Sequence, residues 1–419
     1  MRRQPGLWHL ILGASLLFGL SLVVVQRWLE RGDLSDVPVY QHYAELMRSG
    51  QVPYRDFAVE YPPAALPVFL VPAYLPWSYA TAFAVEMGLC GAGVLVAAAA
   101  ALRAVGAERR RVAGALLLIA AAPFVLASLF PTRFDLWPCL LALASLAFVL
   151  RRQPVPAGAL AALAFSAKLW PLALAPIGLA YLWRACGGRA AGAAAAAFVA
   201  VTALAFLPFA AIAPGGVRHS LVGQLDRPLQ VESLGAAALM AAERLGGPVE
   251  PTTTSHGSQG LSGSLPDAVA AATTGIEIAL VLAIVIAFAR LRRPTGEAVL
   301  LASAATLATL VAFGKVFSPQ FLIWLVPFVP LVRGRRGFGA SLLLLLALAL
   351  THAWFPSRYW QLALDHASPW CWILLARDLA VVAIAAVLAW PGGLRLEHEP
   401  FGKHRARLEA LRAIRVQVE

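Results

Sequence analysis

Carboxylate and aromatic side chains crowd into one stretch near the start of the chain, DLSDVPVYQHYAELMRSGQVPYRDFAVEYPP, residues 33–63. An ionised carboxylate can take a proton from a hydroxyl, and a tyrosine ring offers an apolar face with a polar tip. The residues that could contribute such chemistry are Asp33, Asp36, Tyr40, His42, Tyr43, Tyr54, Asp56, Glu60 and Tyr61. A solvated connector without chemistry remains the simpler alternative.

The composition of the whole chain predicts an all-α polytopic membrane protein. Of 419 residues, 60% are hydrophobic and only 13% are charged, which is far from the composition of a soluble domain. The net charge of +12 comes from arginine clusters between apolar runs, as in cytoplasmic loops, and does not indicate nucleic-acid binding. The four scattered cysteines are interpreted as small core residues.

The apolar runs predict a bundle of about 12 transmembrane helices. The first run follows Arg2 and Arg3, is too long for a signal peptide, and is expected to be an uncleaved helix with a cytoplasmic N-terminus. The expected spans are about 7–27, 78–102, 112–130, 134–150, a hairpin at 157–183, 190–213, 268–290, 296–313, 319–333, 338–354 and 370–390. Residues 1–394 then form one membrane domain.

The hairpin at 157–183 follows from charge and proline. A single helix there would place every later arginine cluster on the outer face, against the positive-inside rule. Pro171 disfavours a continuous helix, and two halves of about 12 to 14 residues are too short to span the membrane upright. The sequence therefore predicts a break near Lys168, at the outer tip of a thin hairpin that lines a cavity.

Three segments are expected outside the membrane. Residues 28–77 form the first outer loop, and residues 214–267 form a long second one. The second loop contains RPLQVESLGAAALMAAERLG, expected as a surface-lying amphipathic helix, and PTTTSHGSQGLSGS, expected to be mobile. Residues 395–419 form a cytoplasmic tail, either an amphipathic helix on the inner leaflet or a disordered segment.

Several charged or polar side chains are expected at the outer ends of the spans, in the same leaflet as Asp36. They are Arg133, Asp135, Lys168, Lys315, His352 and Arg358. The chain contains 34 lysines and arginines, of which only Lys168, Lys315 and Lys403 are lysines. A compact ammonium kept at an outer span end favours phosphate binding or a carboxylate partner. Arg133 and Asp135 have a second interpretation, a purely structural pair with each other.

Carboxylates, aromatic rings and cations at an outer membrane face suit the transfer of a sugar from a polyprenyl-phosphate donor. An aspartate would deprotonate the acceptor hydroxyl, and a lysine or arginine would stabilise the leaving phosphate. The sequence has no Walker loop, no GxGxxG after a strand, no GxSxG and no HExxH, so we expect neither a cofactor nor a metal.

Five blocks of the sequence resemble glycosyltransferase family 87, within the GT-C superfamily of membrane glycosyltransferases. They are SDVPVYQHYAELMRSGQVPYRDFAVEYPP, PTRFDLWPCLLALASLAF, GALAALAFSAKLWPLALAPI, DRPLQVESLGA and FGKVFSPQFLIWLVPFVPL. The resemblance implies a polyprenyl-phosphate sugar donor, usually mannose, inversion at the anomeric carbon, and an essential aspartate in the first outer loop. That aspartate maps to Asp36, with Asp33 as its competitor.

The candidate site is therefore Asp36 as general base, with substrate contacts from the outer-face residues. These contacts are Tyr40, Tyr43, Glu60, Tyr61, Arg133, Asp135, Lys168, Lys315, Gln320, His352 and Arg358. Arg133, Lys315 or Arg358 is expected beside Asp36, although Asp36 could instead cap a helix that begins near Pro38, with Ser35 as a rival cap.

The expected partners are the donor lipid, a cell-envelope glycolipid or glycan acceptor, and membrane lipids, in a bacterial plasma membrane with both termini cytoplasmic. A lipid or glycan transporter and a non-catalytic assembly protein remain alternatives.

Overall fold

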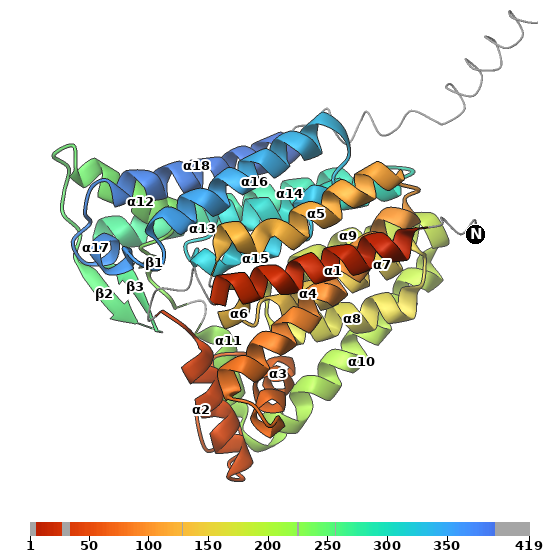
Figure 1. Cartoon of the computed structure of the whole chain (residues 1–419), viewed down its shortest axis with the longest axis horizontal. Helices are drawn as coiled ribbons and strands as arrows, with labels where there is room; N and C mark the ends of the chain where they lie inside the picture. The colour runs from red at the N-terminus through yellow and green to blue at the C-terminus, as the bar shows by residue number, and fades with distance from the viewer. Residues whose placement is uncertain (1–5, 27–33, 128, 224–225, 256, 390–419) are drawn as a thin grey trace, which may run out of the picture.

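The computed structural model describes residues 6–26, 34–127, 129–223, 226–255 and 257–389, and these residues are mostly helical (Figure 1). Predictions that concern Asp33, the first five residues or the tail from 395 lie outside the described residues. The predictions can be compared with the structure for the membrane domain, for the first outer loop from residue 34, and for most of the second outer loop.

Seven described helices are long and apolar enough to cross a membrane, judged by length and composition. They are α1 (Leu7–Val24), α4 (Tyr79–Ala104), α10 (Gly188–Ile212), α13 (Ser264–Ala289), α14 (Gly296–Phe313), α16 (Gly334–Trp354) and α18 (Trp370–Ala389). Large apolar side chains on α10, such as Leu204 at 74% exposed and Val199 at 65%, face away from the protein. Such surfaces suit lipid rather than water, so the chain is a multi-pass membrane protein.

Further helices complete the bundle where additional spans were expected. They are α5 (Arg109–Leu126), α6 (Leu129–Thr132), α7 (Leu136–Leu150), α8 (Pro154–Ala167), the 3-10 turn η4 (Trp170–Leu174) and α9 (Ala175–Cys186). Their positions agree with the hydrophobic runs in the sequence. Either their length or their composition falls short of a full span, so the expected total of about 12 spans stays a prediction.

The predicted break near Lys168 is confirmed. Lys168 has an extended backbone, with φ −157° and ψ 145°, between α8 and η4. A Cβ on Gly178 in α9 would lie 3.3 Å from Val149 at the end of α7, while Lys168 pairs with Asp135 before the start of α7. Helix α9 therefore runs back along the bundle, and 154–186 is a hairpin with Lys168 at its tip.

The expected span at 319–333 is not a regular helix. It consists of η5 (Pro319–Phe321), the single turn α15 (Leu322–Leu325) and η6 (Val329–Leu331). Three prolines, at 319, 327 and 330, remove backbone donors and interrupt the helix. The segment is tolerated because its side chains from Leu322 to Leu331 are almost all buried inside the protein.

The first outer loop is a folded cap rather than an open loop. It contains α2 (Val37–Arg48), η2 (Pro63–Ala65), α3 (Leu66–Leu70) and η3 (Val71–Tyr74). Tyr40 is fully buried and stacks on Phe69 with ring centroids 4.4 Å apart. Aromatic packing therefore fixes α2 against α3.

The described residues of the second outer loop are also folded, and most of the stretch that was predicted to be mobile instead forms two paired strands. The loop contains α11 (Pro214–Val222), β1 (Leu229–Gln230), α12 (Leu234–Glu243), β2 (Thr252–Ser255) and β3 (Ser258–Leu261). The sheet has the order β1-β3-β2 with antiparallel pairs, so that Gly260 faces both Gln230 and Thr253. Gly257, at φ 65°, supplies the left-handed residue of the hairpin turn.

Helix α12 was expected to lie on the membrane surface, but one face of it is buried against α18. Its buried residues are Gly235, Ala236, Ala237, Met240 and Ala241. These small side chains allow close approach between helices, and that packing replaces the expected lipid contact.

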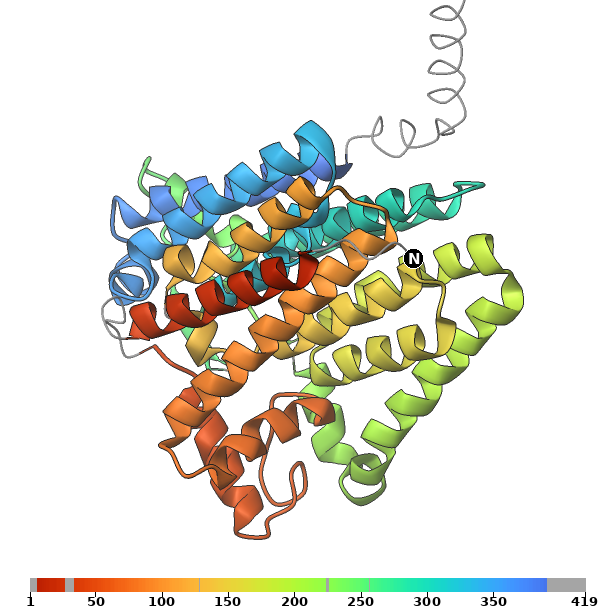
Figure 2. The same cartoon turned by 45° about the vertical axis from the view of Figure 1, so that its right-hand side comes forward.

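Elements from the two loops that are expected outside the membrane gather at one end of the bundle, on the left and lower left of Figure 1. The β-sheet, α2 and α17 (Tyr359–Ala363) all lie there, while α1 begins at the opposite end. Figure 2 shows the bundle after rotation, with the red-orange segment that contains α2 and α3 at its lower left. At the opposite end, Arg111 pairs with Glu297, and Arg184 donates to the Ala289 carbonyl at 3.2 Å. Basic side chains therefore lie at the end of the bundle away from the sheet, and the side of the membrane that each end faces stays a prediction.

Candidate active site

Asp36 directly precedes α2, yet its carboxylate does not cap that helix. The helix N-terminus is instead served by Ser35, whose Oγ accepts from the Val37 amide at 3.2 Å. The Asp36 side chain remains 29% exposed and turns to two partners from the protein. The rival interpretation of Asp36 as a cap therefore loses its structural basis.

Arg133 and Tyr40 hold the Asp36 carboxylate. Arg133 Nη1 lies 3.0 Å from Asp36 Oδ1, and the Tyr40 hydroxyl donates to Oδ2 at 3.3 Å. Burial raises the pKa of the Tyr40 phenol well above its usual value, so its hydroxyl stays protonated and remains a donor. Arg133 is one of the three cations expected near Asp36, and the structure places it against the carboxylate.

Arg133 connects three distant parts of the chain. Besides Asp36, its guanidinium donates to the Leu34 carbonyl at 3.0 Å and to Gln320 Oε1 at 3.2 Å. The planar guanidinium has five donors in a fixed geometry, so these contacts fix its orientation. The alternative pairing of Arg133 with Asp135 is not what the structure shows.

Asp135 pairs with Lys168 instead. The carboxylate is fully buried, and its Oδ1 accepts from both the Lys168 ammonium and the Trp324 indole. The ammonium also lies over the rings of Phe134, at 4.8 Å, and Trp324, at 5.3 Å. The pair and the aromatic rings fix the hairpin tip against α7 and α15.

A cavity of about 490 Å³ opens beside Asp36. Its polar lining comes from the first outer loop, α6–α7, the hairpin tip, the second outer loop, η5 and α17. The predicted site residues that line it are Asp36, Glu60, Tyr61, Arg133, Lys168 and Gln320. The structure therefore brings together six predicted residues from four separate regions of the sequence.

The other predicted residues do not appear among the described residues that line this cavity. Tyr40 and Asp135 support the residues that do line it, and Tyr43 packs on Phe57 and Phe69. Lys315 lies next to the sheet, where its carbonyl accepts from the Gln230 amide at 3.0 Å. His352 and Arg358 are exposed, and the Arg358 guanidinium lies 5.6 Å from the centroid of the Trp370 ring.

Part of the lining was missed by reasoning from the sequence. The second outer loop contributes Arg227, Gln230, Glu232 and Gln259, and the region of α17 contributes Tyr359 and Trp360. Glu232 is only 2% exposed, and burial raises its pKa to about 7. The block DRPLQVESLGA carried a usable signal, because its single glutamate sits just before Ser233, the actual cap of α12.

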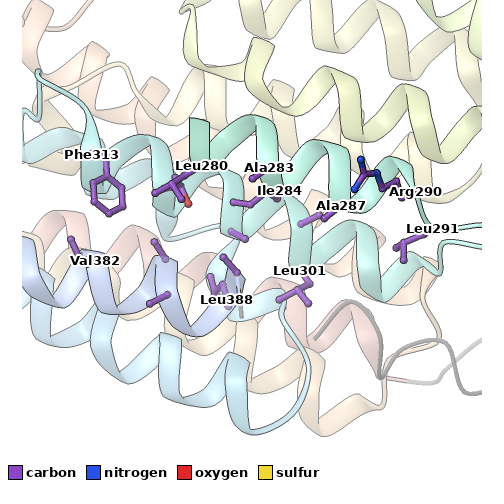
Figure 3. Close-up of a pocket in the computed structure, with 16 residues that line it drawn as sticks. Leu280, Ala283, Ile284, Ala287, Arg290, Leu291, Leu301, Phe313, Val382 and Leu388 are labelled. Carbon is purple, nitrogen blue, oxygen red and sulfur yellow. The ribbon is translucent and has the colours of Figure 1, made fainter. Parts of the chain in front are cut away.

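A larger cavity of about 660 Å³ lies between α13, α14 and α18 (Figure 3). Its lining is apolar except for Arg290 at one end and Thr309, and Figure 3 shows Phe313 at the opposite end from Arg290. It offers no base, so the smaller polar cavity is the better site for chemistry. No group of three His, Cys, Asp or Glu side chains that could hold a metal occurs in the part of the chain that the structure describes.

Fold and site define a multi-pass helical membrane protein with a polar, carboxylate-containing cavity at the end opposite its basic loops. The sequence model of glycosyltransferase family 87 matches residues 59–319, more than half of the chain. The chain belongs to glycosyltransferase family 87 and is a membrane glycosyltransferase. The matched stretch includes Arg133, Lys168 and Glu232 and begins after Asp36.

Two solved structures are similar in fold at low identity. One is ArnT from Cupriavidus metallidurans bound to undecaprenyl phosphate, with 12% identity, a TM-score of 0.49, and coverage of 94% of this chain and 79% of the other. The other is the archaeal oligosaccharyltransferase AglB from Archaeoglobus fulgidus, in complex with an inhibitory peptide and a dolichol-phosphate. It has 14% identity, a TM-score of 0.44, and coverage of 97% of this chain and 60% of the other. Among curated proteins, none matches the chain.

Proposed function

We propose that this protein transfers mannose from a polyprenyl-phosphate donor to a hydroxyl of a cell-envelope glycolipid or glycan, at the extracytoplasmic face of a bacterial plasma membrane. Both termini lie in the cytoplasm in this arrangement, and the bundle is of the GT-C type. The observation that carries the proposal is the Asp36 carboxylate, held by Arg133 and Tyr40 at the edge of a polar cavity.

Asp36 acts as the general base in this reaction. The acceptor oxygen attacks the anomeric carbon of the donor, its proton passes to Asp36, and the bond between that carbon and the phosphate oxygen breaks. The bonding electrons leave with the polyprenyl phosphate, which gains one negative charge. Attack from the face opposite the leaving phosphate inverts the anomeric configuration.

The leaving phosphate needs hydrogen-bond donors, and the hairpin tip supplies them. Lys168 lines the cavity, and its ammonium has three N–H donors, one of which is directed to Asp135. Trp170 also lines the cavity, and its indole N–H has no hydrogen-bond partner among the described residues. We assign the phosphate to this edge, where donors stabilise the charge that develops.

The decisive experiment uses purified protein in lipid nanodiscs. The donor is polyprenyl-phosphate mannose with a label in its mannose, and a lipid extract supplies the acceptor. A transferase moves the label to a new lipid or glycan, or slowly releases it as mannose when no acceptor is added. A transporter leaves the sugar–phosphate bond intact, and an intact donor after long incubation with folded protein overturns the proposal.

A further inference from the structure

One wall of the cavity is built from the β-sheet and its flanking turn, a surface that the proposed reaction has not used. We call it the sheet wall and define it by Gln230 in β1, Glu232 just after β1, Ser258 and Gln259 in β3, and Tyr359 and Trp360 in α17. The remaining lining includes Asp36, Arg133 and Lys168 from other parts of the fold.

The backbone of the sheet wall is rigidly held. The Gln230 amide donates to the Lys315 carbonyl at 3.0 Å, and the Val231 amide donates to the Gln259 carbonyl at 3.2 Å. The Glu232 carbonyl accepts from Arg377 Nη2 at 2.7 Å, and Arg377 is completely buried in α18. The side chains at 230 and 232 are therefore presented from a fixed frame, as a preorganised binding surface requires.

Two acceptor atoms of this wall are buried without a hydrogen-bond partner. They are Gln230 Oε1 and Glu232 Oε2, on side chains that are 3% and 2% exposed, and neither has a partner within the described ranges. Buried polar atoms are nearly always paired, because an unpaired one loses its hydration without replacement. Both residues line the cavity, so a molecule in the cavity can supply the missing donors.

The type of missing partner distinguishes between ligands. Carboxylate and amide oxygens accept hydrogen bonds, and an ionised phosphate has only acceptors, so these two oxygens would repel a phosphate. Sugar hydroxyls donate hydrogen bonds and match it. Lys168 and Trp170, elsewhere in the lining, instead present N–H groups, which donate hydrogen bonds.

Aromatic side chains complete the sheet wall. Trp360 lies at the cavity with 50% of its surface exposed, and its ring packs edge-on against Tyr359 at 5.1 Å. An exposed indole beside polar acceptors offers a flat face for the C–H side of a sugar ring while the acceptors bind its hydroxyls.

We propose that the sheet wall is a carbohydrate subsite in which Gln230 and Glu232 accept hydrogen bonds from sugar hydroxyls and Trp360 stacks on the ring. This inference rests on the proposed function and adds to it the part of the cavity that recognises the sugar. The sugar belongs either to the donor or to the acceptor, and the chemistry of recognition is the same for both.

The test measures binding of polyprenyl phosphate and of polyprenyl-phosphate mannose to the full chain in nanodiscs, and steady-state transfer to octyl α-mannoside. The variants are Glu232→Gln and Trp360→Ala. Glu243→Gln is the matched control, because Glu243 lies in the same loop and pairs with His366 at 2.6 Å away from the cavity lining.

For a donor sugar in the subsite, Glu232→Gln weakens binding of polyprenyl-phosphate mannose about tenfold and leaves binding of polyprenyl phosphate unchanged. For an acceptor sugar, donor binding is unchanged and the KM for octyl α-mannoside rises about tenfold. Trp360→Ala produces the same selective loss. Its exposed side chain can be truncated without opening the core, so this variant keeps the test valid if Glu232→Gln does not fold.

The proposal is overturned if both variants bind the two lipids and use octyl α-mannoside like the wild type. It is equally overturned if both variants weaken polyprenyl phosphate as much as its mannosyl derivative, because the wall would then act on the phosphate or on folding. A failure of the proposed function gives a different result. The wild-type protein would then bind polyprenyl-phosphate mannose more tightly than the Glu232→Gln variant does, but neither protein would break the sugar–phosphate bond.

Discussion

Arg133 Nη1 lies 3.0 Å from Asp36 Oδ1, and this contact joins the first outer loop to the turn between α6 and α7. The guanidinium is almost fully buried, with 6% of its side chain exposed, whereas the carboxylate keeps 29%. The arginine is therefore the fixed partner, and the aspartate is the one that a substrate can reach. This asymmetry is what a general base at the edge of a cavity requires.

Replacing Asp36 by Asn tests the proposed base. The amide keeps the shape of the side chain and can still accept from Arg133, but it cannot take a proton. We expect donor binding close to wild type and a loss of transfer of at least about a hundredfold. The measurement is mannose transfer on membranes matched for protein level.

Asp33→Asn and Glu60→Gln are the controls for Asp36→Asn, and both are expected to be much milder. Glu60→Gln should mainly disturb the turn that follows it. Near-normal transfer by Asp36→Asn removes the proposed base, and a larger loss in Asp33→Asn moves the role to that residue.

Lys168 combines a structural and a proposed phosphate-binding role, and a paired substitution separates them. Lys168→Met leaves the buried Asp135 carboxylate without its cation, which should destabilise the protein by roughly 3–5 kcal/mol. The double variant Lys168→Met with Asp135→Asn should recover most of the Tm. If Lys168 also holds the phosphate, the double variant still needs about tenfold more donor.

Lys168→Arg should restore donor use only in part, since the guanidinium needs more room. Lys315→Met should affect donor use less than Lys168→Met, because Lys315 is not among the described cavity-lining residues. Normal donor use by the stable double variant would show that Lys168 is purely structural.

The topology of the hairpin can be tested with cysteine labelling. Cys186 is exposed, whereas Cys90, Cys139 and Cys371 are buried, so the wild-type chain already carries one reporter at the end of α9. A membrane-impermeant maleimide should label Cys186 only from the cytoplasmic side. Gln153→Cys in a Cys186→Ala background should behave in the same way, since both ends of the hairpin are expected on one face.

Labelling of either position from outside would contradict the hairpin as a re-entrant element, and with it the predicted side of every later loop. An added cysteine at 187 provides an independent check if Cys186 reacts slowly.

Glu232 predicts a pH-dependent difference in stability. Burial raises its pKa in the folded chain to about 7 from an ordinary value near 4.5, so the folded state holds the proton more tightly than the unfolded state. Its contribution to stability is therefore complete below about pH 4.5 and declines as the pH rises towards 7. The total change is at most on the order of 3 kcal/mol.

Glutamine at 232 does not titrate. The Tm of Glu232→Gln minus that of the wild type, without ligand, should therefore increase between pH 5 and pH 8. Arg377, Asp378, Arg227 and Tyr359 face Glu232 and are common to both proteins, so their own titration largely cancels in the difference. A difference that is flat or falls with pH would show that Glu232 is not held as a buried acid.

The order and approximate bounds of the spans were predictable from the sequence because they depend on local properties. Hydrophobic length, arginine clusters and the proline after Lys168 act within a few residues of the chain, and they locate helices and breaks wherever these segments end up. The same local reasoning failed at 319–333. Hydrophobicity correctly predicted a buried segment there, but the prolines prevent the regular helix that was expected. This reasoning also failed at 252–261, where a polar stretch gained order from pairing with β1.

The pairings within the site were decided only by the tertiary structure. Arg133 was two residues from Asp135 in the sequence, but it meets Asp36, while Asp135 meets Lys168 from the hairpin tip. Glu232 became part of the cavity because the sheet and α18 hold its turn there. The sequence specified which groups were available for chemistry. Which of them meet depends on contacts between distant segments, and in a buried site the loss of hydration makes each such contact selective for one partner.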